Sequence, residues 1–260
     1  MSGLVKRITI ITGHYGSGKT ELAVNLAVKA KEKSKAVATV AGYGKTALID
    51  LDVANPYFRS RERQAALENL GISVYSNTFG FDISADLPAI AASVRAPLED
   101  RNTFAVIDAG GNDSGARVLN QFRKYFGDES AMLFVINANR PETSTFEGAA
   151  GHLVSVMEET GLEVGGIVNN THMLGETGPK DVIKGYELCR SISESFGIPL
   201  VWNCCSEGLR GTPDMEAAKS EYGLDLLPLT IYMRASWMDN SRNDKTDVQK
   251  EGQRCLSRKV

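Results

Sequence analysis

The sequence predicts an α/β protein with three α/β/α layers, in which helices cover both faces of a doubly wound, mostly parallel sheet. Two observations lead to this fold class. Short apolar runs alternate with longer helical patterns along the chain, and the apolar runs carry few charges in their interiors. Strands that are buried on both faces read as Val- and Ile-rich runs of this kind. The length of 260 residues suits one large domain.

Each apolar run is predicted to be a strand, and each helical pattern a helix. The predicted strands are 8–12, 47–51, 73–75, 104–107, 132–137, 164–169 and 200–203. The predicted helices are 19–34, 59–70, 87–94, 116–126, 145–159 and 180–196. Because strands and helices alternate, we expect crossover connections between parallel strands.

Two segments depart from this alternation. Residues 36–45 are small and contain glycine, which fits either a hairpin or a loose loop. Residues 236–260 hold six Lys/Arg and four Asp/Glu among Asn, Ser and Gln, and they show almost no apolar periodicity. We therefore expect a nucleotide-binding domain over 1–235 and a mobile polar tail over 236–260, with a docked helix as the alternative for the tail.

Composition argues against three classes of protein, namely nucleic-acid-binding, membrane-inserted and disulfide-bonded secreted proteins. The chain has 29 basic and 32 acidic side chains, so its net charge of −3 gives no sign of a nucleic-acid partner. No export signal precedes the first apolar run, and no run is long enough for stable insertion in a membrane. The four cysteines form no C-x-x-C pair. A reducing, cytoplasmic location is therefore expected.

A glycine-rich segment at 13–20 reads GHYGSGKT and matches the phosphate-binding pattern G-x-x-x-x-G-K-[ST]. Glycines allow backbone N–H groups to converge on phosphates, and the helix that follows offers its positive end to the same anions. Lys19 is expected to reach the β- and γ-phosphates, and the Thr20 hydroxyl to ligate Mg²⁺. The predicted nucleotide contacts here are Gly13, His14, Tyr15, Gly16, Ser17, Gly18, Lys19, Thr20 and Glu21.

Aspartates lie at or just after the ends of two other predicted strands. Asp50 and Asp52 point the same way if they extend their strand, because side chains alternate between its faces. Asp108 ends an apolar run and precedes Gly111, although an ordinary strand-to-loop turn would look similar. Clustered carboxylates are costly unless positive charge lies between them, and a Mg²⁺–phosphate centre supplies that charge. Thr20, Asp50 and Asp108 are therefore the predicted metal ligands.

Together, these segments resemble the SIMIBI class of P-loop NTPases, and specifically its branch of MinD/ParA partition ATPases, Mrp-type carriers and CobQ/CobB-like proteins. The resemblance extends over about residues 5–230. It implies a P-loop NTPase fold that binds ATP (or ADP) with Mg²⁺. It also implies that Asp50 and Asp108 serve the metal, that Asp52 orients the attacking water, and that Gly111 leaves room for the γ-phosphate. Residues 55–62 resemble the switch I continuation of this class.

One position departs from the MinD/ParA pattern. Those proteins carry an extra lysine early in the P-loop, which reaches the partner's nucleotide across a dimer, whereas this chain has His14 there. A neutral imidazole cannot replace a permanent ammonium group. The chain therefore lacks the residue that indicates a homodimer in the MinD/ParA proteins, and a homodimer remains one alternative. Arg59, Arg61 and Arg140 are candidates to supply a cation in trans, and surface positions are the alternative for each.

The segment after residues 164–169 bears on the choice of base. GTPases usually present N-K-x-D at such a place, but here Asn170-Thr171-His172 follows. The resembled ATPases contact adenine with an asparagine, which makes Asn169 the candidate and Asn170 the fallback. Residues 204–209 would form the other wall of the base pocket. Cys204 and Cys205 would bridge a metal across a dimer or, alternatively, end a buried strand.

Three functions fit these residues. The first is a slow ATPase switch that acts on an unknown protein partner, with Lys19 and Asp52 as the catalytic residues and with switch segments at 50–62 and 108–115. The second is an ATP-dependent small-molecule kinase or CobQ/CobB-like synthetase, in which residues 78–100 and 171–181 are long enough for a lid. The third is a nucleotide-binding scaffold without hydrolysis.

Overall fold

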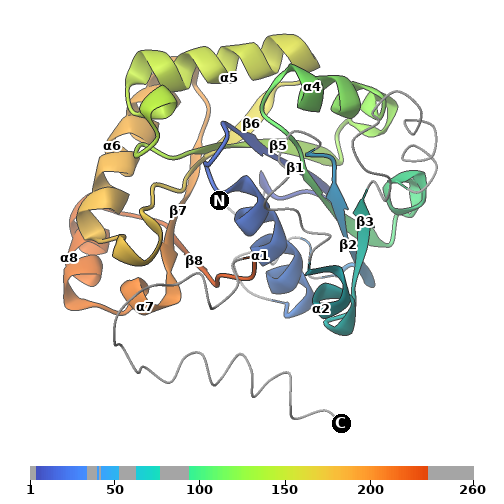
Figure 1. Ribbon diagram of the computed structural model, residues 1–260, viewed down its shortest axis with the longest axis horizontal. Coiled ribbons are helices and arrows are strands. Elements are labelled where there is room, and N and C mark those ends of the chain that lie inside the picture. Colours follow the sequence, from blue (N-terminus) through green and yellow to red (C-terminus); the bar gives the residue numbers. More distant parts are fainter. Residues whose placement is uncertain (1–3, 34–39, 41, 53–62, 77–93, 234–260) are drawn as a thin grey trace.

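The computed structural model describes residues 4–33, 40, 42–52, 63–76 and 94–233, which form one eight-stranded sheet with helices on both faces (Figure 1). The strand order is β3-β2-β4-β1-β5-β6-β7-β8, and each neighbouring pair is parallel. The first strand, β1, therefore lies near the middle of the sheet, with β4, β2 and β3 on one side of it and β5 to β8 on the other. The predicted doubly wound α/β fold class is confirmed.

The strands are β1 (Ile8–Gly13), β2 (Lys45–Asp50), β3 (Ile72–Ser76), β4 (Thr103–Asp108), β5 (Ser130–Ile136), β6 (Val164–Asn169), β7 (Leu200–Ser206) and β8 (Leu226–Leu229). The helices are α1 (Lys19–Lys31), α2 (Gln64–Asn69), α4 (Asp113–Asn120), α5 (Phe146–Thr160), α6 (Pro179–Phe196), α7 (Glu207–Arg210) and α8 (Pro213–Tyr222). Residues 94–99 are also helical, and short 3-10 turns lie at Arg123–Tyr125, Pro141–Thr143 and Leu174–Glu176.

Each predicted strand is present, and β8, α7 and α8 are additions that the sequence reading missed. β8 is four residues long and contains Pro228, and among the described strands it pairs only with β7, as an edge strand with proline does. Such a strand has too little alternation to be recognised from sequence. The predicted helix 116–126 divides into α4 and a 3-10 turn, because the Asn112 side chain caps α4 earlier, by accepting from Gly115 N–H.

Several predictions fall outside the described residues. These are the tail 236–260, the switch-like segment 55–62 with Arg59 and Arg61, most of the loop 36–45, and nearly all of the helix 87–94.

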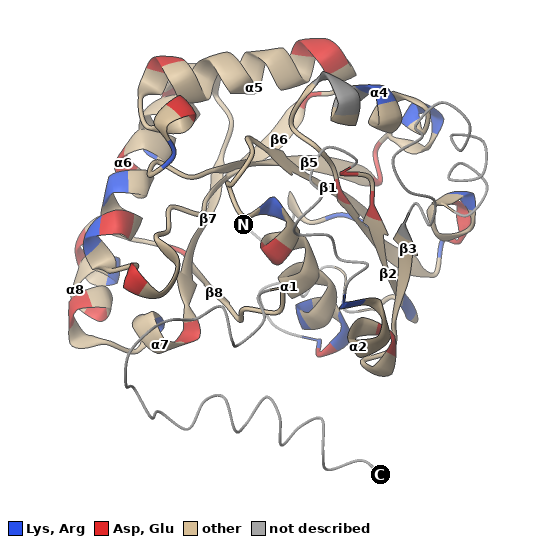
Figure 2. Cartoon of the chain, viewed as in Figure 1, with Lys and Arg blue, Asp and Glu red and all other residues tan. Residues whose placement is uncertain are grey.

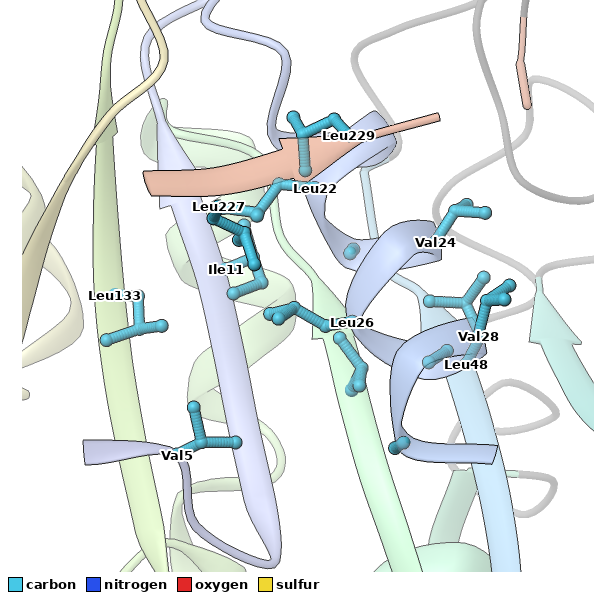
Figure 3. Close-up of a cluster of buried hydrophobic side chains, with 14 of the residues drawn as sticks. Val5, Ile11, Leu22, Val24, Leu26, Val28, Leu48, Leu133, Leu227 and Leu229 are labelled. Carbon is cyan, nitrogen blue, oxygen red and sulfur yellow. The ribbon is translucent and has the colours of Figure 1, made fainter. Parts of the chain in front are cut away.

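Two hydrophobic layers hold the helices on the sheet. On one face, Leu22 and Leu26 of α1 pack with Ile11 of β1 and with Leu227 of β8 (Figure 3). On the other face, residues 94–98 and the helices α4, α5 and α6 pack against the opposite sides of the same central strands. Burial on both faces explains why the central strands are apolar along their whole length.

Charged residues lie mainly on the helices, with both signs interspersed (Figure 2). Within the described part of the chain, no helix combines the length and the apolar character needed to cross a membrane.

The sheet brings three acidic and phosphate-binding segments to one edge. β4 lies between β1 and β2, and its register sets Asp108 beside both Ile11 and Asp50. Because parallel strands end at the same edge, the loop after β1 and the carboxylates after β2 and β4 meet there.

Candidate nucleotide-binding site

The loop between β1 and α1 has the backbone that its glycines allow. Gly16 and Gly18 adopt left-handed conformations with φ of 75° and 80°, which side chains with a Cβ rarely tolerate. Ser17 N–H donates to the carbonyl of His14 at 3.1 Å and closes the turn. The loop then enters α1 at Lys19, so the positive end of this helix faces the loop.

Side chains that follow β5 and β6 bind the backbone carbonyls of the loop. The Asn137 amide and the Arg140 guanidinium donate to the carbonyl of Gly16 at 3.3 and 3.0 Å. The Asn170 amide donates to the carbonyl of Ser17 at 2.8 Å. These bonds fix carbonyl oxygens that would otherwise repel an anion. Sequence reasoning missed the role of Asn137, although an asparagine that directly follows a buried strand was a signal for it.

Lys19 and Asp52 form a buried ion pair, with Nζ 2.8 Å from Oδ2. Burial by itself would lower the pKa of Lys19, but Asp52 and then Asp108 outweigh it and raise that pKa. Lys19 is therefore held as an ammonium group inside the site. The two residues predicted to be catalytic lie together in the structure.

Thr20 and Asp108 are joined by a short hydrogen bond, in which Thr20 Oγ1 donates to Asp108 Oδ2 at 2.6 Å. Burial raises the pKa of Asp108 to about 7, although Lys19 opposes this shift. The other oxygen, Oδ1, is buried and has no hydrogen-bond partner among the described residues. An orphaned buried carboxylate oxygen beside a threonine hydroxyl suits the oxygen ligands that Mg²⁺ prefers.

Asp50 completes the acidic side of the site. Its Oδ1 accepts the backbone N–H of Asp52 at 3.1 Å, and it lies opposite Asp108 in the sheet register. In the described part of the chain, no three His, Cys, Asp or Glu side chains are grouped so that they could hold a metal by themselves. A magnesium ion here would therefore need phosphate oxygens and waters as further ligands, as it does in many nucleotide sites.

Gly111 packs directly on the P-loop. A Cβ at this position would collide with the carbonyl of Gly13. Gly111 is thus in close backbone contact with the loop, and a side chain here would displace the loop. That Gly111 leaves room for a γ-phosphate stays a prediction.

Glu21 makes contacts that the sequence did not suggest. Its carboxylate accepts the backbone N–H groups of Tyr232 and Met233 at 2.6 and 3.2 Å. Burial raises the pKa of Glu21 to about 7, and the two N–H groups oppose the shift. Asn25, one turn later, binds the backbone of Thr230. The first turns of α1 thus hold the segment that follows β8.

Asn169 is fully buried, and its amide group forms hydrogen bonds with other groups of the protein. Its Nδ2 donates to the carbonyl of Val182 and to Asn203 Oδ1, both at 2.9 Å, and its Oδ1 accepts the Thr171 N–H at 3.1 Å. The structure does not bring Asn169 to the P-loop, whereas Asn170 contacts it. The assignment of Asn169 to a base stays a prediction.

His14 and Tyr15 open onto a cavity of about 280 Å³. The His14 ring packs against the His152 ring of α5, with centroids 4.3 Å apart. The cavity thus lies between the P-loop, the end of β4 and α5. It is lined by His14, Tyr15, Lys19, Asp52, Gly110, Gly111, Asn112, His152, Ser155 and Glu159.

Comparisons with known proteins give structural neighbours only. No family model matches the chain, and no curated protein does. The chain is similar to the cell division protein FtsY from Thermotoga maritima, with 21% identity and a TM-score of 0.45 over 74% of this chain and 59% of that one.

It is also similar to the signal recognition particle 54 kDa protein from Aeropyrum pernix K1 in complex with GDP, with 22% identity and a TM-score of 0.48 over 84% of this chain and 49% of that one. A third neighbour is FlhF complexed with GTP/Mg²⁺, with 14% identity and a TM-score of 0.47 over 75% and 64%. The chain spans less than two thirds of the length of each of these proteins.

Proposed function

We propose that this chain is a Mg²⁺-dependent, nucleoside triphosphate-binding switch protein of the SIMIBI class that slowly hydrolyses its nucleotide. The observation that supports this most is the meeting of three segments at one sheet edge. The glycine-bent loop, the buried Lys19–Asp52 pair and the Thr20–Asp108 pair lie together there. Phosphate, metal and water each have a chemically suitable partner in this set.

In this proposal the loop 13–20 binds the phosphates through its backbone, and Lys19 exchanges Asp52 for the terminal phosphates. Asp52 then orients the attacking water, an assignment supported by its contact with Lys19, the residue proposed to bind the terminal phosphates. Water attacks the γ-phosphorus, and the bond from this atom to the β–γ bridging oxygen breaks. The nucleoside diphosphate leaves with the bridging oxygen, inorganic phosphate forms with the oxygen of the water, and the proton of the water passes to the phosphate or to solvent.

Thr20, Asp108 and Asp50 would hold the Mg²⁺, directly or through water. The bound metal would neutralise charge on the β- and γ-phosphates. The observation that supports this assignment is the buried Asp108 Oδ1, which has no hydrogen-bond partner in the described part of the chain. Because burial raises the pKa of Asp108, binding of the cation favours release of a proton from this carboxyl group, since a carboxylic acid is a poor metal ligand.

The base is proposed to be adenine, because no N-K-x-D sequence follows β6. Fluorescent analogues of ATP and GTP, titrated with Mg²⁺, test the choice by their dissociation constants. ATP is expected to bind at least about 10-fold more tightly. Equal or tighter binding of GTP would overturn this part of the proposal and leave the phosphate site unaffected.

A second function, transfer of the γ-phosphoryl group to a small molecule, is supported by the cavity beside Lys19 and Asp52. An acceptor hydroxyl in that space would attack the γ-phosphorus and give a phosphate ester and the diphosphate. Nucleotide consumption that depends strictly on one added metabolite would favour this function over the switch.

The main test uses purified wild-type protein, Lys19→Met and Asp52→Asn. Loss of Lys19 is expected to weaken nucleotide binding about 10-fold or more, because a charged hydrogen bond to phosphate is lost. Asp52→Asn is expected to bind nucleotide and to lose turnover. Absence of nucleotide binding by the wild type in millimolar Mg²⁺ would refute the proposed function.

A further inference from the structure

The chain returns to the helix of the phosphate loop after its last strand. Residues 230–233, which we call the docked segment, follow β8 and lie against the first turns of α1. Met233 is buried and belongs to the same apolar cluster as Leu22 of α1. Leu227 and Leu229 of β8 lie next to Leu22 in that cluster (Figure 3). The described chain thus ends on the helix that begins at the phosphate loop.

Asn25 binds the docked segment through both ends of its amide group. Its Nδ2 donates to the carbonyl of Thr230 at 2.8 Å, and its Oδ1 accepts the Thr230 N–H at 2.9 Å. Asn25 is 1% exposed, and its Nδ2 also donates to the carbonyl of Glu21 at 2.8 Å. Because the polar atoms of a buried amide need partners, Asn25 fixes where the segment lies.

Glu21 binds the other end of the docked segment with its carboxylate. Its Oε1 accepts the Tyr232 N–H at 2.6 Å, and its Oε2 accepts the Met233 N–H at 3.2 Å. Both oxygens of the carboxylate therefore face this segment, which lies more than 200 residues away in the chain.

The position of Glu21 within α1 makes these bonds informative. The helix begins at Lys19 with Gly18 as its N-cap residue, so Glu21 occupies the third helical position. A glutamate at that position commonly reaches back and accepts the backbone N–H of the N-cap residue. In α1 that N–H belongs to Gly18, which lies in the loop proposed to bind phosphate. The docked segment binds the carboxylate instead.

Another helix of the same chain has the usual arrangement. α6 also has a glycine, Gly178, as its N-cap residue and an acidic residue, Asp181, at its third position. Asp181 Oδ2 accepts the Gly178 N–H at 2.9 Å. The equivalent bond in α1 would place the Glu21 carboxylate on the Gly18 N–H. It would thus bring negative charge to the phosphate loop and satisfy a donor that a phosphate would use.

We propose that the docked segment regulates the nucleotide site by holding Glu21 away from the phosphate loop. When the segment is released, the Glu21 carboxylate loses two donors and accepts the Gly18 N–H. It then competes with phosphate for the positive end of α1, and nucleotide affinity falls. Glu21 is thus an internal competitor of the phosphate. The inference rests on the proposed function, because the ligand that competes with Glu21 is the bound nucleotide.

The same competition couples docking to nucleotide binding in both directions. A nucleotide binds more tightly to the docked state, so it stabilises docking by the free energy by which docking favours the nucleotide. The amide hydrogens of Tyr232 and Met233 report on docking, because both bind Glu21. We expect their exchange with solvent, followed by mass spectrometry or NMR, to slow several-fold when nucleotide and Mg²⁺ bind to the wild type.

Asn25→Ala tests the proposal by releasing the segment while Glu21 keeps its charge. The affinity for a fluorescent nucleotide analogue is expected to fall about 5-fold or more, as is typical of coupled sites. Glu21→Met removes the competitor, since methionine has no carboxylate, and should bind the analogue within about 2-fold of the wild type. The double variant Asn25→Ala/Glu21→Met should therefore regain the affinity that Asn25→Ala loses. A purely structural role of Asn25 predicts no such rescue.

Thr230→Pro releases the segment from its own side, because proline offers no N–H to Asn25 Oδ1. It should lower the affinity as Asn25→Ala does and should also be rescued by Glu21→Met, and it preserves the test if Asn25→Ala fails to fold. Glu147→Met is the matched control, because it removes an exposed carboxylate from the first turn of another helix, α5. This control should change neither the affinity nor the amide exchange.

Rescue by Glu21→Met, together with slower exchange of the two amides in the presence of nucleotide, would support the inference. Three results would each overturn it: wild-type affinity in both Asn25→Ala and Thr230→Pro, affinity that stays low in both double variants, or amide exchange that nucleotide does not change. If the wild type itself binds no nucleotide, the proposed function is refuted and this inference with it.

Discussion

Lys19 Nζ lies 2.8 Å from Asp52 Oδ2, and both side chains are buried, so the P-loop lysine is neutralised by a carboxylate from a different strand end. The two residues are far apart in the chain and meet only because β1 and β2 flank β4. In the proposed function, a nucleotide that binds Lys19 must compete with Asp52 for its ammonium group. This competition would couple the phosphate site to the end of β2, where Asp52 is located.

Removal of one member of this pair should destabilise the protein. Lys19→Met leaves the Asp52 carboxylate buried without the ammonium group, and we expect a loss of about 3 kcal/mol in the free energy of unfolding. This is the low end for a buried pair, because Asp108 can take up a proton in response. The double variant Lys19→Met/Asp52→Asn should regain at least half of the loss in urea denaturation. An additive double variant would show that the pair is not coupled.

Thr20→Val should impair the metal response more than the fold. The variant removes the hydroxyl that donates to Asp108 and that would also ligate the cation. We expect the apparent affinity for Mg²⁺, measured by titration of nucleotide binding, to fall about 10-fold or more. Thr20→Ser keeps the hydroxyl and should behave like the wild type. Equal Mg²⁺ affinities for Val and Ser would remove Thr20 from the metal site.

Gly111→Ala should lower stability and nucleotide affinity together. The added Cβ would collide with the Gly13 carbonyl, so the P-loop must move, at a cost of about 1–3 kcal/mol. Gly127→Ala is the matched control, because a Cβ there meets nothing within 4 Å. Its effect should stay within about 0.5 kcal/mol in thermal denaturation. A stable Gly111→Ala protein with normal nucleotide affinity would contradict the contact.

Asn170→Ala should weaken nucleotide binding through the loop itself. Without the amide, the buried Ser17 carbonyl loses its donor, at a cost of about 1–3 kcal/mol, and the loop gains freedom to turn. Asn102→Ala removes a cap on the Gly44 N–H far from the loop, and should reduce stability without changing nucleotide affinity. Fluorescence titration distinguishes the two variants. The same affinity in both would show that Asn170 does not support the loop.

The stability of the nucleotide-free protein should depend on pH through Asp108. Burial raises the folded-state pKa of this carboxyl from 3.8 to about 7. Between about pH 4 and pH 7 the folded protein therefore holds a proton that the unfolded chain has released. The Asp108 contribution to the free energy of unfolding then falls as pH rises through this window, by at most about 1.4 kcal/mol per pH unit, and levels off above pH 7. Glu21, whose pKa burial also raises to about 7, adds a contribution of the same sign.

Asp108→Asn should remove this component. Urea denaturation at several pH values between 4.5 and 8 gives the difference between wild type and variant, which should change across the window. A difference that is constant with pH would mean that Asp108 is ionised throughout.

The sequence by itself determined the fold class, the central strands and the phosphate loop. Apolar runs, Gly16, Gly18 and Lys19 act through local backbone geometry and periodicity, so a short window contains the information. The carboxylates at 50, 52 and 108 were also recognisable, because each ends an apolar run. The edge strand β8 was not predicted from the sequence, because a segment of four residues that contains a proline shows no periodicity of apolar side chains.

Only the tertiary structure decided which partner each polar side chain uses. Glu21 binds the backbone of Tyr232 and Met233, Asn169 is enclosed by its own network, and His14 meets His152 of α5. Tyr232, Asn203 and His152 are each distant in the chain from the residue that they contact, and they carry no motif. A buried polar group must be satisfied, but which segment satisfies it depends on how the helices pack on the sheet.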